Sequence, residues 1–212
     1  TDVLQELPEK TEELARCDLM PEQEELYQRV LSSSRRSLLN QLEGDERVPF
    51  IHIFALLAKL KQICNHPASF HGDTQNYKKY QSGKWQLFVE LLGQARESCE
   101  KVVVFTQYLN MLEIFEKHLK EVGTEFALIK GSTTNRRREL QKFHEDPNCQ
   151  VFLGSLGAVG LGVDLTPASI VIHYDRWWNP AVEQQATDRV HRMGQKRGVQ
   201  VFKLITKNTI EE

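Results

Sequence analysis

Two arginines near the end of the chain have a spacing that suits the binding of one polyphosphate. Arg189 and Arg192 lie three positions apart in the segment 184–195. On a helix, side chains three positions apart share a face, so two permanent planar cations could meet the same anion. Phosphoryl transfer spreads negative charge over the oxygens of the transferred group, and guanidinium groups stabilise that charge. For this spacing alone, two solvated arginines on a surface helix are the alternative.

A glycine-rich loop follows the apolar run 151–153. Gly157, Gly160 and Gly162 are spaced so that their backbone amides could approach a phosphate closely. Glycines after a strand are more often simple turn residues. The loop by itself therefore leaves both readings open.

Small hydroxyl and basic side chains at the ends of expected strands could bind a nucleic-acid backbone. Such donors bind phosphate oxygens whatever the base sequence. The candidates are Thr106, Lys130, Ser132 and Thr133, together with the basic run Arg136, Arg137 and Arg138. The run opens a helix and could follow a line of phosphates, with a solvated helix face as the alternative.

Several other chemistries lack the residues they need. Gly83-Lys84 is followed by Trp85 and has no upstream glycine at the required spacing, so there is no complete phosphate-binding P-loop. The four cysteines include no Cys-x-x-Cys pair, which predicts no metal site and a reducing compartment. The formal net charge is -2, so any affinity for nucleic acid must come from a local patch. No apolar run approaches the ~20 residues that span a bilayer, which predicts no membrane partner.

The elements that must position these residues follow an α/β pattern in the second part of the chain. Short apolar runs alternate with amphipathic helices, which is typical of a parallel sheet flanked by helices. The expected strands are 102–105, 126–129, 151–153, 170–173 and 199–204, and the expected helices are 109–121, 136–145 and 182–192. Ligands of open parallel sheets bind at the carboxyl ends of the strands. We therefore expect function in the segments that begin at Thr106, Gly131, Ser155 and Asp175.

The first part of the chain is expected to be helical. Pro21 suits a first helical turn, and a broken apolar stripe continues to Leu42, before a polar break at 44–46. A second helix is expected over 49–63, since Pro67 disfavours its continuation. We expect residues 1–81 to form a linker and a helical arm, and residues 82–212 to form the α/β domain. The ends of the chain suggest a piece cut from a longer protein.

These segments, taken in order, resemble the motifs of the SWI/SNF-type family of superfamily-two helicase-like ATPases. Segment 102–108 is similar to motif IV, 153–166 to motif V and 184–195 to motif VI. Further matches in the same order are 60–67, 131–143, 174–180 and 201–212. The resemblance covers nearly the whole chain. It implies a RecA-like C-terminal lobe, lobe 2, preceded by a helical arm.

The resemblance also implies roles for individual residues. Arg189 and Arg192 would be arginine fingers that reach across a cleft to ATP, which is held with Mg²⁺ mainly by an N-terminal lobe outside this sequence. The other residues assigned to the nucleotide side are Gly160, Gly162, Asp164, Gln185, Asp188 and His191. His191 is expected to be a hydrogen-bonded organiser, with proton transfer as the alternative. Ser155 and Gly157 would contact the DNA backbone.

The implied function is that of a motor lobe of an ATP-dependent translocase on double-stranded DNA, similar to chromatin remodellers. The intact protein would be a DNA-dependent ATPase, and this fragment alone is expected to be inactive. It would work inside the cell, in the cytoplasm or nucleoid of a prokaryote or in a nucleus, with DNA-bound proteins as candidate substrates. Two alternatives stay open: a strand-separating DNA or RNA helicase, and a non-catalytic module derived from a motor. Departures in motif V, such as Gly157 where many relatives carry Lys, leave room for the second alternative.

Overall fold

The computed structural model describes residues 7–43, 50–159 and 162–212, without the side chains of residues 37–43. The chain divides into two compact units. The first unit contains Phe88–Ile205 and the N-terminal segment up to Ala15, and the second contains Arg16–Leu87 and Thr206–Glu212.

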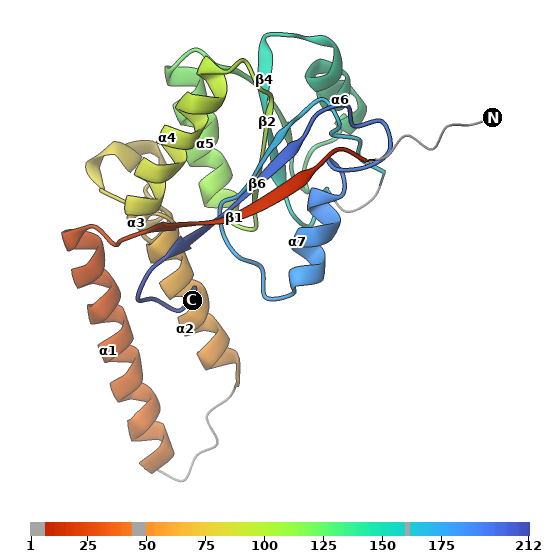
Figure 1. Cartoon of the computed structure of the whole chain (residues 1–212). Coiled ribbons are helices and arrows are strands. Elements are labelled where there is room, and N and C mark those ends of the chain that lie inside the picture. The colour runs from red at the N-terminus through yellow and green to blue at the C-terminus, as the bar shows by residue number, and fades with distance from the viewer. Residues whose placement is uncertain (1–6, 44–49, 160–161) are drawn as a thin grey trace. The chain divides into compact units, whose positions relative to one another are not determined.

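A six-stranded parallel sheet forms the centre of the first unit (Figure 1). Its strands are β1 (Lys10–Cys17), β2 (Val102–Thr106), β3 (Glu125–Ile129), β4 (Cys149–Ser155), β5 (Ile170–His173) and β6 (Val199–Thr206), in the order β1-β6-β5-β2-β4-β3. β2 pairs in parallel with both β4 and β5, β4 with β3, and β5 with β6. The expected α/β fold with a parallel sheet is confirmed.

Helices cover both faces of the sheet (Figure 1). They are α4 (Gly83–Glu97), α5 (Leu109–Glu121), α6 (Arg136–Glu145) and α7 (Pro180–Thr187). Alternate residues of a strand point to opposite faces, so Val103 and Phe105 of β2 pack in the core with Phe143 of α6. On the other face, Phe88 of α4 and Phe115 of α5 stack at 4.8 Å between ring centroids. The functional loops are therefore held by a sheet that is buried on both sides.

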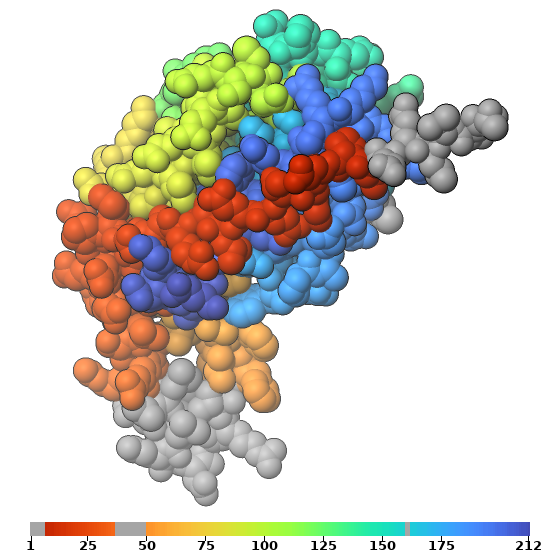
Figure 2. Space-filling view, in the orientation of Figure 1, coloured from red at the N-terminus to blue at the C-terminus, as the bar shows by residue number. Residues whose placement is uncertain are grey.

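β1 is an edge strand that the sequence did not predict. The sequence predicts a linker and a helical arm over residues 1–81, without a strand. In the structure, the backbone N–H of Val199 donates to the carbonyl of Glu9 at 2.9 Å, and Lys203 forms an ion pair with Glu12 at 2.7 Å. Both strands therefore run in the same direction. Four successive residues of β1 are exposed, as Figure 2 shows for the red segment. An edge strand with so little burial carries no apolar alternation to detect.

The second unit is helical. Its elements are α1 (Pro21–Glu43), α2 (Phe50–Asn65), the short α3 (Pro67–His71), the 3₁₀ helix η1 (Thr74–Lys79) and the first turn of α4. Two of these, α1 and α2, match the two helices expected from the apolar stripes, and the expected break at 44–46 lies outside the described residues. Tyr27, Leu60, Ile63 and Cys64 form the core. In the described part of the chain, no helix combines the length and the apolar character that crossing a bilayer requires.

A buried ion pair lies within the second unit. Lys84 Nζ is 2.6 Å from Glu211 Oε1, and neither side chain is exposed. Lys84 also donates to Asn65 Oδ1 at 3.0 Å, and Glu211 accepts from the backbone N–H of Thr206 at 2.8 Å. Buried charges need such partners because desolvation is costly. Lys84, which follows Gly83, is therefore held by buried partners within the second unit.

Candidate functional site

The arginine segment forms a turn and not a helix. α7 ends at Thr187, whereas the sequence predicts a helix up to Arg192. The backbone N–H groups of Arg189 and Val190 donate to carbonyls three residues earlier, at 3.1 and 2.9 Å, which tightens the chain. The carbonyl of Arg189 accepts from the N–H of Leu165 at 3.0 Å, which ties this turn to the loop before β5. The predicted common helix face of the two arginines is wrong.

Both arginines still reach the surface. Arg189 is half-buried and Arg192 is exposed. Arg192 forms no ion pair with any carboxylate among the residues that the structure describes. An exposed guanidinium without a carboxylate partner can bind an anion from outside the chain. Arg192 in this turn is therefore available to an anion from outside the chain, although the two arginines do not share a helix face as predicted.

The loop before β5 is joined to this arginine turn. Besides the bond from Leu165 to Arg189, the side chain of Gln195 donates to the carbonyl of Thr166 at 3.1 Å. Asp164 is half-buried, and its carboxylate accepts from the N–H of Thr166 at 3.1 Å. Hydrogen bonds therefore hold the loop that contains Asp164 against the turn that contains Arg189.

The remaining nucleotide-side candidates differ in their exposure. His191 is half-buried and its Nε2 lies 2.7 Å from the carbonyl oxygen of Pro8, a contact that suits an organiser. Gln185 and Asp188 are exposed, and Gly162 is exposed with a φ of 74°. Gly160 lies outside the described residues.

The arginine turn lies at the amino ends of the strands, away from the carboxyl ends at which we expect function from the sequence. The chain leaves β5 at its carboxyl end, and α7 leads it back to the start of the parallel strand β6 (Figure 1). The turn, at 188–198, directly precedes β6, and the loop 163–169 directly precedes β5. A parallel connection must return in this way.

At the carboxyl ends, Thr106 is used inside the fold. Its side chain is fully buried, and its hydroxyl donates to the buried carboxylate of Asp175. The same oxygen accepts from the N–H of Tyr108 at 3.1 Å, while Asp175 also accepts from the N–H of Gln107 at 3.2 Å. Thr106 therefore joins the ends of β2 and β5 and has no surface to offer a phosphate, which corrects its predicted contact with DNA.

The turn after β4 carries two more DNA candidates. Ser155 is nearly buried, and its carbonyl accepts from the N–H groups of Ala158 and Val159 at 2.9 and 3.2 Å. Gly157 is exposed at the tip, where an added Cβ would meet no atom within 4 Å. Packing therefore does not require glycine at position 157. This turn can approach a partner through its backbone and Gly157 more readily than through Ser155.

The other DNA candidates gather around one hollow of about 380 Å³ beside the end of β3. Lys130, Ser132, Thr133 and Arg138 line it. Lys130 and Thr133 form a closed turn, because the N–H of Lys130 donates to Thr133 Oγ1 and the N–H of Thr133 donates to the Lys130 carbonyl, both at 2.9 Å. Ser132 and Arg138 are exposed. These four predicted residues are brought together at one place on the surface.

The basic run is presented by the first turn of α6. Asn135 caps this helix, since its side chain accepts from the N–H of Arg138 at 3.0 Å. All three arginines of the run, Arg136, Arg137 and Arg138, are exposed. Arg136 donates to the carbonyl of Ala158 at 3.1 Å, which ties the run to the turn after β4.

Two buried carboxylates that hold the loop after β5 were not predicted as site residues. Asp175 receives the bonds from β2 described above. Glu183, also buried, accepts from Arg176 Nε at 2.9 Å and from the N–H of Trp177 at 2.8 Å. An acidic residue that directly follows an apolar strand, as Asp175 does, was the available signal. Glu183 gave none, because an acidic residue in the first turn of a helix is usually solvated.

His173 links β5 to the end of α7. Its Nε2 lies 2.8 Å from Thr187 Oγ1, and the ring is fully buried. Burial disfavours the charged imidazole and lowers its pKa from 6.5 to about 4. The side chain is therefore neutral at physiological pH.

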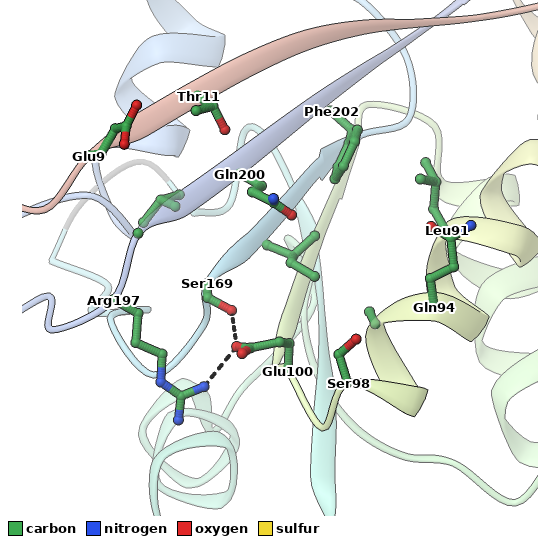
Figure 3. A pocket seen from close by; sticks show the side chains of 14 residues that line it. Glu9, Thr11, Leu91, Gln94, Ser98, Glu100, Ser169, Arg197, Gln200 and Phe202 are labelled. Carbon is green, nitrogen blue, oxygen red and sulfur yellow. Dashed lines mark hydrogen bonds and ion pairs between the residues drawn. The ribbon is translucent and has the colours of Figure 1, made fainter.

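A larger hollow, of about 660 Å³, contains none of the predicted site residues (Figure 3). At one side of it, Glu100 accepts from the hydroxyl of Ser169 and from Arg197 Nη1, the latter at 2.7 Å. These two bonds lower the pKa of Glu100. Glu100 thereby ties the chain before β6 to the chain before β2.

The sequence is similar to known families over most of its length. A family described as "Helicase conserved C-terminal domain" matches residues 83–194, and one described as "SNF2-related domain" matches residues 1–69. The chain is 40% identical over 215 residues to the putative ATP-dependent helicase/translocase YwqA of Bacillus subtilis, covering 100% of this chain and 23% of that protein. It is 37% identical over 212 residues to an uncharacterized ATP-dependent helicase of Mycoplasma pneumoniae, covering 99% and 20%.

The fold is also similar to a solved structure described as the Sulfolobus solfataricus SWI2/SNF2 ATPase core in complex with dsDNA. The TM-score is 0.78 at 35% identity, covering 99% of this chain and 43% of that chain. The chain spans about a fifth of the length of the curated relatives it matches.

Proposed function

Because the chain belongs to the family of SNF2-related, helicase-like ATPases and has the RecA-like fold of their C-terminal lobe, we propose that it is the second motor lobe of an ATP-dependent translocase on double-stranded DNA. One observation carries the proposal. The loop 163–168 is joined to a turn that holds Arg189 half-buried and leaves Arg192 exposed. In the longer protein, residues 1–81 act as linker and arm, and residues 82–212 act as the motor lobe.

Arg189 and Arg192 bind the phosphates of a nucleotide held mainly by an N-terminal lobe of the same protein. ATP, bound there with Mg²⁺, supplies the phosphoanhydride bond whose hydrolysis drives movement. The two guanidiniums stabilise the charge that develops on the transferred phosphoryl group, and they do so only when the lobes close. Asp164 and His191 orient the two segments through the bonds described above, and the exposed Gly162, Gln185 and Asp188 lie beside them in sequence.

The opposite end of the sheet tracks the DNA backbone. Lys130, Ser132 and Thr133 offer donors around their hollow, and the three arginines of the basic run extend the positive charge along α6. The turn with Ser155 and Gly157 completes this surface. Contacts to phosphates position a protein without reading bases. Binding is therefore expected to be largely independent of sequence and strongly dependent on salt.

The descriptions of two relatives support this proposal. One is a putative ATP-dependent helicase/translocase, and the other is a solved structure in complex with dsDNA. DNA-bound proteins are the candidate cargo. The chain alone is expected to hydrolyse ATP negligibly, because in this proposal most of the nucleotide site belongs to the N-terminal lobe.

The proposal is tested on the intact protein by measuring ATP turnover with no nucleic acid, with duplex DNA and with RNA. We expect duplex DNA to stimulate turnover and RNA to have little effect. A strand-displacement assay on the same preparation distinguishes translocation from unwinding. Equal stimulation by RNA, or efficient strand separation, would assign the protein to a different class of helicase.

A further inference from the structure

Gln195 is a buried amide at the centre of the arginine turn. Its side chain is 8% exposed. Nε2 donates to the carbonyl oxygens of Thr166, Ala168 and Val190 at 3.1, 2.9 and 3.0 Å. Oε1 accepts from the backbone N–H groups of Lys196 and Arg197 at 2.9 and 3.0 Å. The NH₂ group has two hydrogens, so two of the three carbonyls share one of them, and the side chain uses its full capacity for donating and accepting hydrogen bonds.

These partners belong to the loop before β5 and to the arginine turn on both sides of Gln195. Thr166 and Ala168 lie in the loop before β5, Val190 lies between the two arginines, and 196–197 lead into β6. The backbone N–H of Gln195 also donates to the carbonyl of Arg192 at 3.0 Å, closing a turn that contains Gly194, whose φ is 98°. One side chain thus fixes the backbone on both sides of Arg192 and next to Arg189.

The far side of the same segment is held by a carboxylate. Arg197, whose N–H is bound by Gln195, places its Nη1 2.7 Å from Glu100, which also accepts from Ser169 (Figure 3). The segment before β6 is therefore held by an amide on one side and by a carboxylate on the other. The ion pair between Arg197 and Glu100 is partly exposed to solvent, so it is expected to hold the segment less strongly than Gln195 does.

We propose that Gln195 is a positioning residue that sets the two arginines for phosphoryl transfer without contacting the nucleotide. This inference rests on the proposed function. A guanidinium acts on a developing charge only when it is held in place, and a displacement of about 1 Å can cost ~100-fold in rate. Neither Glu nor Met reproduces these contacts, because a Glu would set carboxylate oxygens against three carbonyls and a Met would leave them without a donor.

The test uses the intact protein and the substitution Gln195→Glu, which keeps the size and shape of the side chain. We expect the DNA-stimulated kcat to fall about 30- to 100-fold, with the Kd for duplex DNA unchanged within threefold. Gln200→Glu is the matched control, since Gln200 is exposed on β6 and the chemical change is the same. It is expected to leave kcat unchanged within twofold.

A double-mutant cycle separates positioning from general loss of stability. In a background that carries both Arg189→Ala and Arg192→Ala, measured by single-turnover phosphate release, Gln195→Glu is expected to lower the rate less than threefold, because both groups that it positions are gone. An equal loss in both backgrounds would overturn the inference. So would a wild-type kcat for Gln195→Glu. If Arg192→Ala and Arg189→Ala themselves retain full turnover, the proposed function fails instead.

A second variant covers the case in which Gln195→Glu does not fold. Glu100→Gln weakens the outer contacts to Arg197 and Ser169. It is expected to lower kcat about three- to tenfold, with the loss again absent in the background that lacks both arginines. A loss from Glu100→Gln that persists unchanged in that background would contradict the positioning role.

Discussion

Gly83 is a residue that the fold requires to be glycine. A Cβ at this position would lie 1.9 Å from the carbonyl oxygen of Asp18, which is a backbone atom that cannot rotate away. Gly83→Ala is therefore expected to lower the free energy of unfolding of the chain by about 3 kcal/mol. Urea titration followed by circular dichroism measures the change.

Gly93, in the same helix, is the matched control. An added Cβ there would meet no atom within 4 Å, so Gly93→Ala is expected to stabilise the helix by about 0.5–1 kcal/mol. If Gly83→Ala were as well tolerated as Gly93→Ala, the close approach of Asp18 to the start of α4 would be incorrect.

The role of Thr106 could not be predicted from the sequence. Thr106 has the type and the place of a phosphate ligand, at the end of a strand. What decides its role is Asp175, 69 positions further along the chain. A pairing over that distance depends on the order of the strands, which the spacing of residues does not give. The sequence therefore identified the position and missed the partner.

At the scale of elements, strands buried on both faces were predictable and the edge strand was not. The expected strand at 170–173 coincides with β5, because a central parallel strand is a continuous apolar run. β1 pairs on one side only and exposes most of its side chains, so its sequence resembles that of a loop. The end of α7 was misplaced for a related reason: the bond from Leu165 to Arg189 is a tertiary contact that overrides helix propensity.

The contact of β5 with α7 through His173 predicts a pH dependence. The pKa of His173 is about 4 in the folded protein and 6.5 in the unfolded chain. Between these pH values the unfolded chain binds more protons, so the free energy of unfolding falls as the pH drops. Between pH 7 and pH 5 the loss from this residue is expected to be about 2 kcal/mol.

Urea titrations at the two pH values check this, with His173→Gln as the comparison. The variant is less stable overall, but its free energy of unfolding should fall by about 2 kcal/mol less over the same pH range. Identical pH dependences of wild type and variant would show that His173 is not a buried neutral group.

The basic first turn of α6 predicts how the intact protein binds DNA. Arg138→Ala is expected to weaken binding to all duplexes by a similar factor, because a lost phosphate contact is independent of sequence. The slope of log affinity against log salt should become shallower by about 1. Fluorescence anisotropy at several salt concentrations measures both.

Arg96→Ala is the control for this experiment, because Arg96 is exposed in the last turn of α4, away from the hollow at β3. It should leave the slope unchanged. A slope that is the same for Arg138→Ala and wild type would remove α6 from the DNA surface.

At the scale of the whole lobe, the candidate sites divide between the two ends of one sheet. The arginine turn and the loop 163–168 precede β6 and β5, while the hollow at Lys130 and the turn with Gly157 follow β3 and β4. A rigid sheet buried on both faces connects the two ends. In the proposed motor, closure on ATP at one end would thereby be transmitted to the DNA backbone at the other.

The central claim is that the arginine turn acts on ATP bound by another lobe, and the most direct test is the DNA-stimulated kcat of the intact protein carrying Arg192→Ala. Arginine fingers contribute about 10³-fold or more, so we expect kcat to fall about 10³-fold while the Kd for duplex DNA stays within threefold and Arg96→Ala retains wild-type turnover. Turnover within a few-fold of wild type in Arg192→Ala, and in the double variant with Arg189→Ala, would contradict the account.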